Sequence, residues 1–240
     1  MSTILIFSMF KLLFSRTQTL LIVCPLVLFS CTNQANRALF IDEQYSHAVD
    51  AVKHLDKKDI KDLVVLNQSD PLSGVTGDKV LLVTFHDAPE YYKEGTDNIL
   101  KIHVMWTATA KELSYKMTSD PSNCSRIRIS QIIGIGPKDR LTDVSVISVN
   151  ISDLFRPAYN PDVTVNRMSF NLESDNKAFI SFFKNNFVNN TYPWTALGYT
   201  YDYGKEDHYG LSEFVLLKGS RYYVEKTVKI DDYIKNRCQF

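Results

Sequence analysis

Residues 20–29 form a short, uninterrupted apolar run near the N-terminus, and this run decides how much of the chain remains to fold. Lys11 and Arg16 precede the run, and the polar stretch 32–34 follows it. A basic segment, a short apolar segment and a small residue at a cleavage point are typical of a secretory signal peptide. The run is too short to span a bilayer as a helix. The sequence therefore predicts that residues 1–30 are removed and that the remaining 210 residues form the mature protein.

The end of this segment, Leu28-Phe29-Ser30-Cys31, resembles the lipobox of bacterial lipoproteins, in which a small residue precedes an obligatory cysteine. The resemblance implies cleavage before Cys31 and acylation of that residue, palmitate included. Two or more acyl chains anchor a protein stably, so the resemblance places the chain at the cell envelope. Thr32 stands where an aspartate would favour the inner membrane, which implies the outer membrane in a Gram-negative cell. The alternative is an ordinary signal peptide with a chance cysteine.

The charge of the mature chain argues against two classes of partner. Residues 1–30 hold two basic and no acidic side chains, so 25 basic and 27 acidic ones remain. Nucleic-acid binding needs a basic face, and binding to an anionic membrane surface needs a polybasic patch. We therefore expect no nucleic acid as partner, and membrane contact through the lipid alone. A chain this long and 45% hydrophobic should fold as one domain, at residues 40–240 behind a lipidated tether at 31–39.

Two cysteines remain for the folded body. Cys24 leaves with the signal peptide and Cys31 takes lipid, whereas Cys124 and Cys238 lie 114 residues apart in a compartment that permits disulfides. Closing a loop of this length contributes about 4–5 kcal/mol in the chain-entropy model. The alternative is a pair of unpaired cysteines that act as small buried hydrophobes. Sequence leaves both open, because pairing depends on geometry.

The first half of the body predicts a helix, a loop and two strands. Apolar residues at spacings of three and four predict a helix over 41–55, with Asp42 as its N-cap. Residues 67–79, with two glycines and a proline, predict a loop. Residues 80–86 and 99–106 predict strands, and the second strand alternates between a buried and a partly solvated face. The predicted buried positions are Ile102, Val104 and Trp106, and the solvated ones are Lys101, His103 and Met105.

Capping signals predict two further helices in the middle of the chain. Thr109 and Glu112 match a capping box for a short helix that ends near Met117. A second helix is predicted over 125–133, ending before Gly134. The β-branched residues of 143–151 then predict a strand in the interior of a sheet.

The C-terminal third predicts one helix and three strands. A phenylalanine stripe at helical spacing over 179–187 predicts a helix, with Ser174 as candidate cap. Strands are predicted over 197–203, 211–217 and 222–228, the last two joined by a turn. Helices and strands mix without a regular βαβ alternation. The predicted class is α+β, with a mixed or antiparallel sheet, packed helices and a C-terminal antiparallel β-meander.

The sequence lacks the common cofactor and metal motifs. Residues 74–79 lack the spacing and the hydroxyl residue of a phosphate-binding loop, and 134–136 lack the third glycine of a dinucleotide site. No serine occupies a nucleophile elbow. His47 and His54 are seven residues apart, too far to share one ion easily, and a metal site needs three or four ligands. We expect neither a cofactor nor a metal.

The segment 192–214 is the richest in groups that could bind or react. Tyr199, Tyr201 and Tyr203 alternate along a predicted strand and so share one face. An aromatic face beside carboxylates and a histidine could bind a sugar, or place a general acid and base near a bond. The alternative is a half-buried sheet face and a solvated acidic turn; we expect Tyr201 to be structural and any function to lie on the Asp202 side. The candidate groups are Asp202, His208 and Glu213, with the turn 206–208 between them.

Two further residues are candidates by position. His86 closes the strand 80–86 beside Asp87, and strand ends often host sites. Neighbours on an extended chain point to opposite sides, which weakens this pair as a catalytic unit. Arg156, in a proline-containing loop, could meet an anion or bond loop carbonyls, and the second use is the commoner one.

These observations favour a lipid-anchored envelope protein whose body is a binding or interaction module, with an envelope protein or a glycan as partner. The first alternative is a periplasmic hydrolase of envelope glycans or peptides, with Asp202, His208, Glu213 and His86 as candidate catalytic groups. The second is a structural assembly subunit, which would expose a large apolar patch. Convergence of the four candidate groups in one pocket would favour the hydrolase.

Overall fold

The computed structural model describes residue 36 and residues 38–101, 104–188 and 190–240. The predicted signal peptide and the predicted lipidation site, Cys31, lie outside these residues. The chain consists of two units, Met1–Glu43 and Gln44–Phe240. Within the described ranges, no helix is both long enough and apolar enough to cross a membrane.

The predicted first helix is present, but it begins earlier than the sequence suggests. Residues 38–51 are helical, and a short 3-10 helix, η1 (Val52–His54), continues from them. Asp42 therefore lies inside the helix, and its assignment as the N-cap is wrong. The charged run after Leu55 forms another 3-10 turn, η2 (Lys57–Asp59), which Asp56 caps.

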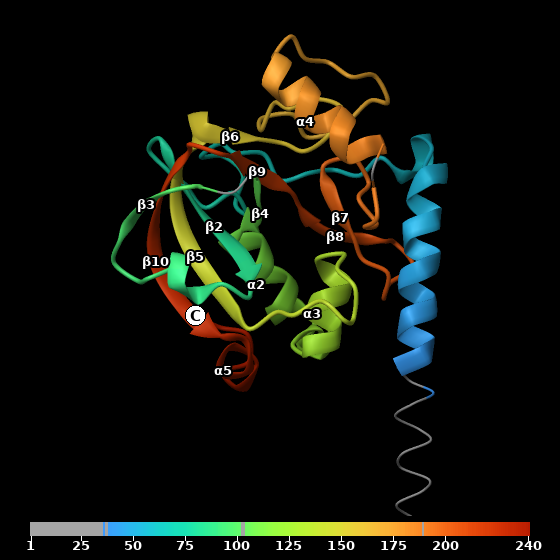
Figure 1. Cartoon of the computed structure of the whole chain (residues 1–240), viewed down its shortest axis with the longest axis horizontal. Coiled ribbons are helices and arrows are strands. Elements are labelled where there is room, and N and C mark those ends of the chain that lie inside the picture. The colour runs from blue at the N-terminus through green and yellow to red at the C-terminus, as the bar shows by residue number, and fades with distance from the viewer. Residues whose placement is uncertain (1–35, 37, 102–103, 189) are drawn as a thin grey trace, which may run out of the picture. The chain divides into compact units, whose positions relative to one another are not determined.

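An antiparallel sheet of eight strands forms the centre of the unit Gln44–Phe240, which confirms the α+β class. The strand order is β3-β10-β5-β2-β4-β9-β6, with β1 paired to β2 (Figure 1). β5 lies between β10 and β2, as its β-branched sequence predicts. The strands are β1 (Val75–Thr76), β2 (Lys79–His86), β3 (Asp97–Ile99), β4 (Val104–Thr109), β5 (Asp143–Asn150), β6 (Leu154–Phe155), β9 (Phe214–Leu217) and β10 (Arg221–Lys229).

Three helices pack against one side of this sheet: α2 (Ala110–Ser119), α3 (Arg126–Ile132) and α5 (Ile230–Lys235). The predicted cap of α2 is confirmed, since Thr109 Oγ1 accepts from Glu112 N. The predicted helix over 125–133 is α3, which Ser125 caps by accepting from Arg128 N. The apolar faces of these helices and of the strands beneath them form one buried cluster, which excludes water from this side of the sheet. Its members include Val83, Leu113, Met117, Ile129, Ile132, Val144, Val146, Leu211, Ile230 and Tyr233.

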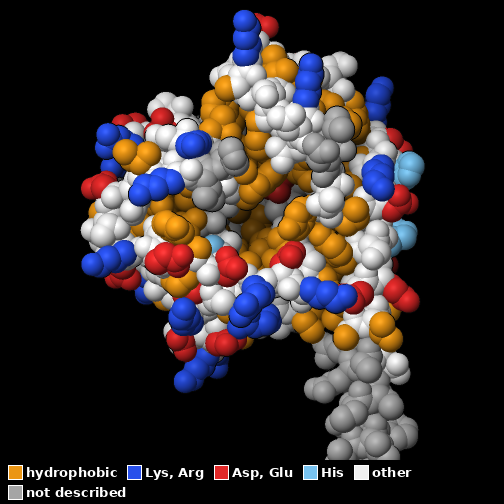
Figure 2. Space-filling model, in the orientation of Figure 1, with side chains coloured by type: hydrophobic (Ala, Val, Ile, Leu, Met, Phe, Trp, Pro, Cys, Tyr) orange, Lys and Arg blue, Asp and Glu red, His pale blue; other side chains and the backbone are white. Residues whose placement is uncertain are grey.

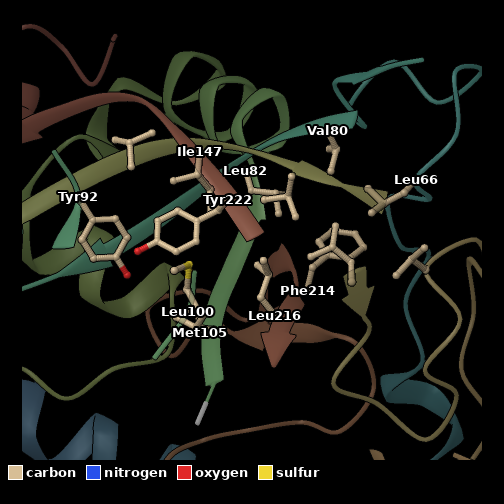
Figure 3. Close-up of a cluster of buried hydrophobic side chains, with 14 residues drawn as sticks. Leu66, Val80, Leu82, Tyr92, Leu100, Met105, Ile147, Phe214, Leu216 and Tyr222 are labelled. Carbon is tan, nitrogen blue, oxygen red and sulfur yellow. The ribbon is translucent and has the colours of Figure 1, made fainter. Parts of the chain in front are cut away.

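A second core fills the other side of the bent sheet, and Figure 3 shows its side chains converging from several strands. Leu82 on β2 and Ile147 on β5 meet Phe214 and Leu216 on β9 in this cluster. Alternate residues of β5 thus face opposite cores, so both sides of the strand are apolar.

The strand predicted over 99–106 is wrong in extent and in phase. The structure has two strands here, β3 and β4, which pair with β10 and β9 respectively. Met105, assigned to the wet face, is buried in the second core, whereas Trp106 is only half-buried. Because β4 carries apolar residues on both faces, alternation alone could not identify its inner face.

The helix with the phenylalanine stripe is α4 (Lys177–Val188). Its cap is Asn176, whose Oδ1 accepts from Ala178 N at 3.0 Å and from Phe179 N at 3.1 Å. The predicted cap, Ser174, is therefore wrong by two residues; its Oγ accepts from Asn176 N instead. Phe179 and Phe183 are buried in an aromatic cluster with Trp194.

The C-terminal strands run antiparallel as predicted, but the strand predicted over 211–217 is broken. β7 (Tyr199–Tyr201) and β8 (Tyr209–Ser212) form a separate two-stranded sheet, and β9 joins the large sheet. Glu213 is the one residue between β8 and β9, where the chain passes from the small sheet to the large one.

Cys124 and Cys238 are joined by a disulfide, with Cα atoms 5.7 Å apart. The structure thus has the paired alternative rather than two free thiols. The bond ties the segment after α5 to the residue just before the cap of α3.

Candidate functional site

A cavity of about 640 Å³ opens where two neighbouring strands of the large sheet separate. β2 pairs with β4 only at Leu82↔Thr109 and Val83↔Ala108, although β2 continues to His86. Figure 2 shows a hollow on this side of the molecule, bordered mainly by hydrophobic side chains. The lining comes from residues 83–87, 106–108, 133–135, 139–141, 190–194 and 200–201, together with Asn186, Leu211 and Glu213.

Glu213 is the most unusual group in this lining. Its side chain is 8% exposed, and its Oε2 has no hydrogen-bond partner among the described residues. Burial raises the pKa of Glu213 to about 8, against a smaller opposing effect of the Arg156 guanidinium. Unpaired buried carboxylates are costly, so the group keeps its proton at neutral pH or requires a partner in the cavity. The backbone fixes its place, since Glu213 N donates to Gly198 O at 2.9 Å.

Two tryptophans line the cavity together with Glu213. The rings of Trp106 and Trp194 meet edge to face, with centroids 6.1 Å apart. Trp194 Nε1 donates to Pro157 O at 2.9 Å, so its N–H is already satisfied. Phe182 of α4 packs against Trp106 at 6.0 Å between ring centroids. The lining tryptophans are therefore held by the aromatic cluster of α4 and offer a ligand their π systems.

The three tyrosines of the predicted hairpin are all buried, which agrees with the expectation that Tyr201 is structural. Tyr199 OH donates to Asp59 O, and Tyr203 OH donates to Ile135 O, both at 2.8 Å. Tyr201 is the one of the three that lines the cavity.

His86 also lines the cavity, but its ring nitrogens are engaged elsewhere. Ala88 N–H donates to Nδ1 at 3.4 Å, which leaves the ring proton on Nε2 to donate to Ser145 Oγ at 2.8 Å. Ser145 continues the chain to Thr227, whose Oγ1 donates to Tyr92 O. Burial lowers the pKa of His86 to about 4, so the imidazole is neutral at physiological pH.

The other two sequence candidates do not reach the cavity. Asp202 is fully buried and bonded by both carboxylate oxygens to Arg128, at 2.9 and 2.8 Å. His208 stacks on Tyr201, with ring centroids 4.4 Å apart, and is absent from the lining. Of the four candidates, the structure brings Glu213 and His86 into one cavity and uses Asp202 to join α3 to the β7–β8 hairpin.

Arg156 is used for loop carbonyls, the commoner of the two alternatives. Its Nη2 donates to Val64 O at 2.7 Å and to Val163 O at 3.2 Å, and the guanidinium lies 4.7 Å from the centroid of the Phe214 ring. A second buried acid, Glu112, bonds Tyr209 OH and Ser212 N and does not line the cavity.

Sequence reasoning missed Trp106 and Trp194 as site residues. Trp106 was assigned to the buried face of a strand, and the position of Trp194 after α4 shows its role only once the helix is packed. One sequence signal did point to Glu213: this glutamate directly precedes the apolar run 214–217. Acids are rarely buried without a partner, so a glutamate next to a buried strand suggests a functional role.

Within the described residues no group of three or more histidines, cysteines, aspartates or glutamates could hold a metal ion. Comparison with known proteins adds no functional assignment: no family model, no curated protein and no solved structure matches this chain.

Proposed function

We propose that this chain is an envelope lipoprotein, anchored through Cys31, whose body binds a small ligand in the cavity beside Glu213. One observation carries the binding proposal: a buried carboxyl group without a partner lines an aromatic cavity of about 640 Å³. Ligand sites are typically concave and largely apolar, with a few converging polar groups. The volume suits a metabolite-sized molecule better than a protein segment.

The engagement of the other polar groups favours binding over catalysis. His86 holds its proton in a chain of hydrogen bonds, and Asp202 is committed to Arg128. Neither is free to act as a base toward a ligand in the cavity. Glu213 is the buried acid of the lining whose Oε2 has no partner, so we assign ligand recognition to it.

The experiment is a ligand screen by thermal shift, with a variant that fills the cavity. A ligand present at 100 times its Kd should raise the Tm by roughly 5–10 °C. Ile135→Trp places a large ring in the lining and should remove the shift. Identical shifts in both proteins would place the binding elsewhere, and no shift across amines, alcohols, acids, sugars and short peptides would reject the proposal.

Hydrolysis is the second candidate, and one feature of the cavity favours it. The raised pKa of Glu213, about 8, supplies a protonated acid at neutral pH, and Asp87 and Asp139 also line the cavity as possible second carboxylates. Cleavage of envelope glycans or peptides that disappears in Glu213→Gln would support this function. Unaltered cleavage in that variant would reject it.

A further inference from the structure

We propose that the ligand of this cavity carries a cationic amine, which Glu213 pairs with while Trp106 and Trp194 surround its apolar part. This inference rests on the proposed binding function and names the ligand class. It stands on three features of the lining: a buried carboxyl whose Oε2 has no partner, two tryptophans that line the same cavity, and an excess of acidic groups.

The first feature is the state of the Glu213 carboxyl. Its Oε2 is buried and lacks a donor, although Arg156 lies near enough to influence it electrostatically. The Arg156 N–H groups that donate go to the carbonyl oxygens of Val64, Val163 and Gly198. The Glu213 side chain lines the cavity, so an ammonium group there would give this carboxyl a charge-assisted partner that the protein does not provide.

The second feature is the chemistry of the walls. Tryptophan is the strongest of the aromatic side chains in attracting cations to its ring face. The Trp194 N–H is occupied by Pro157 O, so this side chain contributes its ring and not a donor. An alkylammonium ion gains from both the rings and the acid.

The third feature is the charge of the lining. Asp87, Asp139 and Glu213 are acidic and Arg140 is the basic residue among them, so acidic groups outnumber basic ones even while Glu213 keeps its proton. His86 is neutral because burial lowers its pKa to about 4, so it adds no positive charge near neutral pH. The acidic excess favours a cation over an anion in the cavity.

Several ionisable groups face Glu213 and enter the pH dependence of this site. They are Arg156 just after β6, Tyr199 and Tyr201 from β7, His86 at the end of β2 and Asp87 after it, Asp139 and Arg140 after α3, and Tyr192 after α4. Burial raises the pKa of both β7 tyrosines above the ordinary 10 and that of Glu213 to about 8. Between pH 6.5 and 8.5 Glu213 is therefore the group expected to change its charge.

The test compares three probes of similar size on the full chain in detergent: 2-phenylethylamine, 2-phenylethanol and 3-phenylpropanoate. The amine should bind at least about tenfold more tightly than the alcohol at pH 8.5, and the propanoate weakest. The affinity for the amine should rise from pH 6.5 to 8.5, as Glu213 loses its proton. A neutral ligand that accepts a hydrogen bond from protonated Glu213 would show the opposite trend.

Glu213→Gln keeps the shape and removes the charge, so it should abolish the preference for the amine while the affinity for the alcohol stays within about threefold. Asp87→Asn is the matched control at the same cavity and should keep most of the preference. Equal binding of amine and alcohol, or a preference that survives Glu213→Gln, overturns the inference and leaves the binding function standing. Binding of none of the three probes also overturns it, and the ligand screen with Ile135→Trp then decides the function separately.

Discussion

Arg128 and Asp202 form a bidentate ion pair, with Nη1–Oδ1 at 2.9 Å and Nη2–Oδ2 at 2.8 Å, between helix α3 and the turn after β7. Asp202 is fully buried and also accepts from Gly204 N at 2.9 Å. The pair closes one side of the hairpin that carries Tyr201 to the cavity. The pair stabilises the fold because removing one partner would leave the other charge buried and uncompensated.

Loss of either partner should therefore be strongly destabilising. Asp202→Ala should lower the free energy of unfolding by about 3–5 kcal/mol, because the Arg128 charge stays largely buried without its partner. Urea denaturation of Asp202→Ala, Arg128→Ala and the double variant measures the coupling, and we expect the double variant to lose less than the sum. Glu206→Ala, in the exposed turn nearby, is the control and should change stability by less than about 0.5 kcal/mol. Additive single losses would show that the pair contributes no coupling.

The buried tyrosines predict a second stability series. Tyr199→Ala and Tyr201→Ala each remove a large buried ring and should cost about 3–5 kcal/mol. Tyr199→Phe keeps the ring and loses only the hydrogen bond to Asp59 O, so it should cost about 1 kcal/mol. Thermal melts compare the three, and unchanged melting temperatures in the alanine variants would mean that the tyrosines form a surface and not a core.

The disulfide predicts a redox-dependent stability. Reduction of the Cys124–Cys238 bond should lower the free energy of unfolding by about 2–5 kcal/mol, because the intact bond closes a long loop and so restricts the unfolded chain. The melting temperature should fall when a reductant is added to the wild type. The double variant Cys124→Ser/Cys238→Ser should melt at the same temperature with and without reductant. Mass mapping that finds two free thiols in protein from the envelope would contradict the pairing.

Glu213 predicts how stability changes with pH. Its folded pKa, about 8, lies above the ordinary value of 4.5, so the folded state holds the proton more tightly than the unfolded state. The stability that this proton provides is complete below about pH 4.5 and is lost as the pH rises through 8. From pH 6.5 to 9 the free energy of unfolding should fall by roughly 2 kcal/mol through this group.

The matched control for that measurement is Glu213→Gln, which cannot titrate and should show a flatter profile over the same range. His86 acts in the opposite direction, since its folded pKa of about 4 makes stability fall as the medium becomes acidic. Above pH 6.5 it is mostly neutral in both states, so this window isolates Glu213. Parallel profiles for the wild type and the glutamine variant would show that Glu213 does not carry a raised pKa.

The anchoring proposal predicts a change in partitioning. The wild type should enter the detergent phase and incorporate labelled palmitate, because acyl chains on the mature N-terminus bury in the bilayer. Cys31→Ser should give an uncleaved or soluble species without label. Equal partitioning of both forms would reject the lipid anchor.

Local sequence signals predicted much of the secondary structure and little of the site. The sequence predicts Thr109 as a cap and a helix from about residue 125, because a helix start depends on hydrogen bonds within three residues. The strand over 143–151 follows from its β-branched residues in the same way. Ser174 and Met105 were assigned wrongly, since several polar residues competed for one cap and both faces of β4 are apolar.

The site is formed by residues that lie far apart in the sequence, and local sequence patterns do not predict which of them come into contact. The sequence makes Asp202 a catalytic candidate, but in the fold its carboxylate pairs with Arg128, 74 residues away in α3. The same packing buries Glu213 Oε2 without a hydrogen-bond partner among the described residues. The sequence by itself determined the class of fold and the starts of helices α2 and α3, because these follow from periodicity and short-range bonding. Only the tertiary structure decided that β2 and β4 separate, that two tryptophans meet at the gap and that Glu213 faces it. Glu213 loses contact with water, and the other lining residues come together around the cavity, only when the chain packs. This burial is what raises the pKa of its carboxyl group.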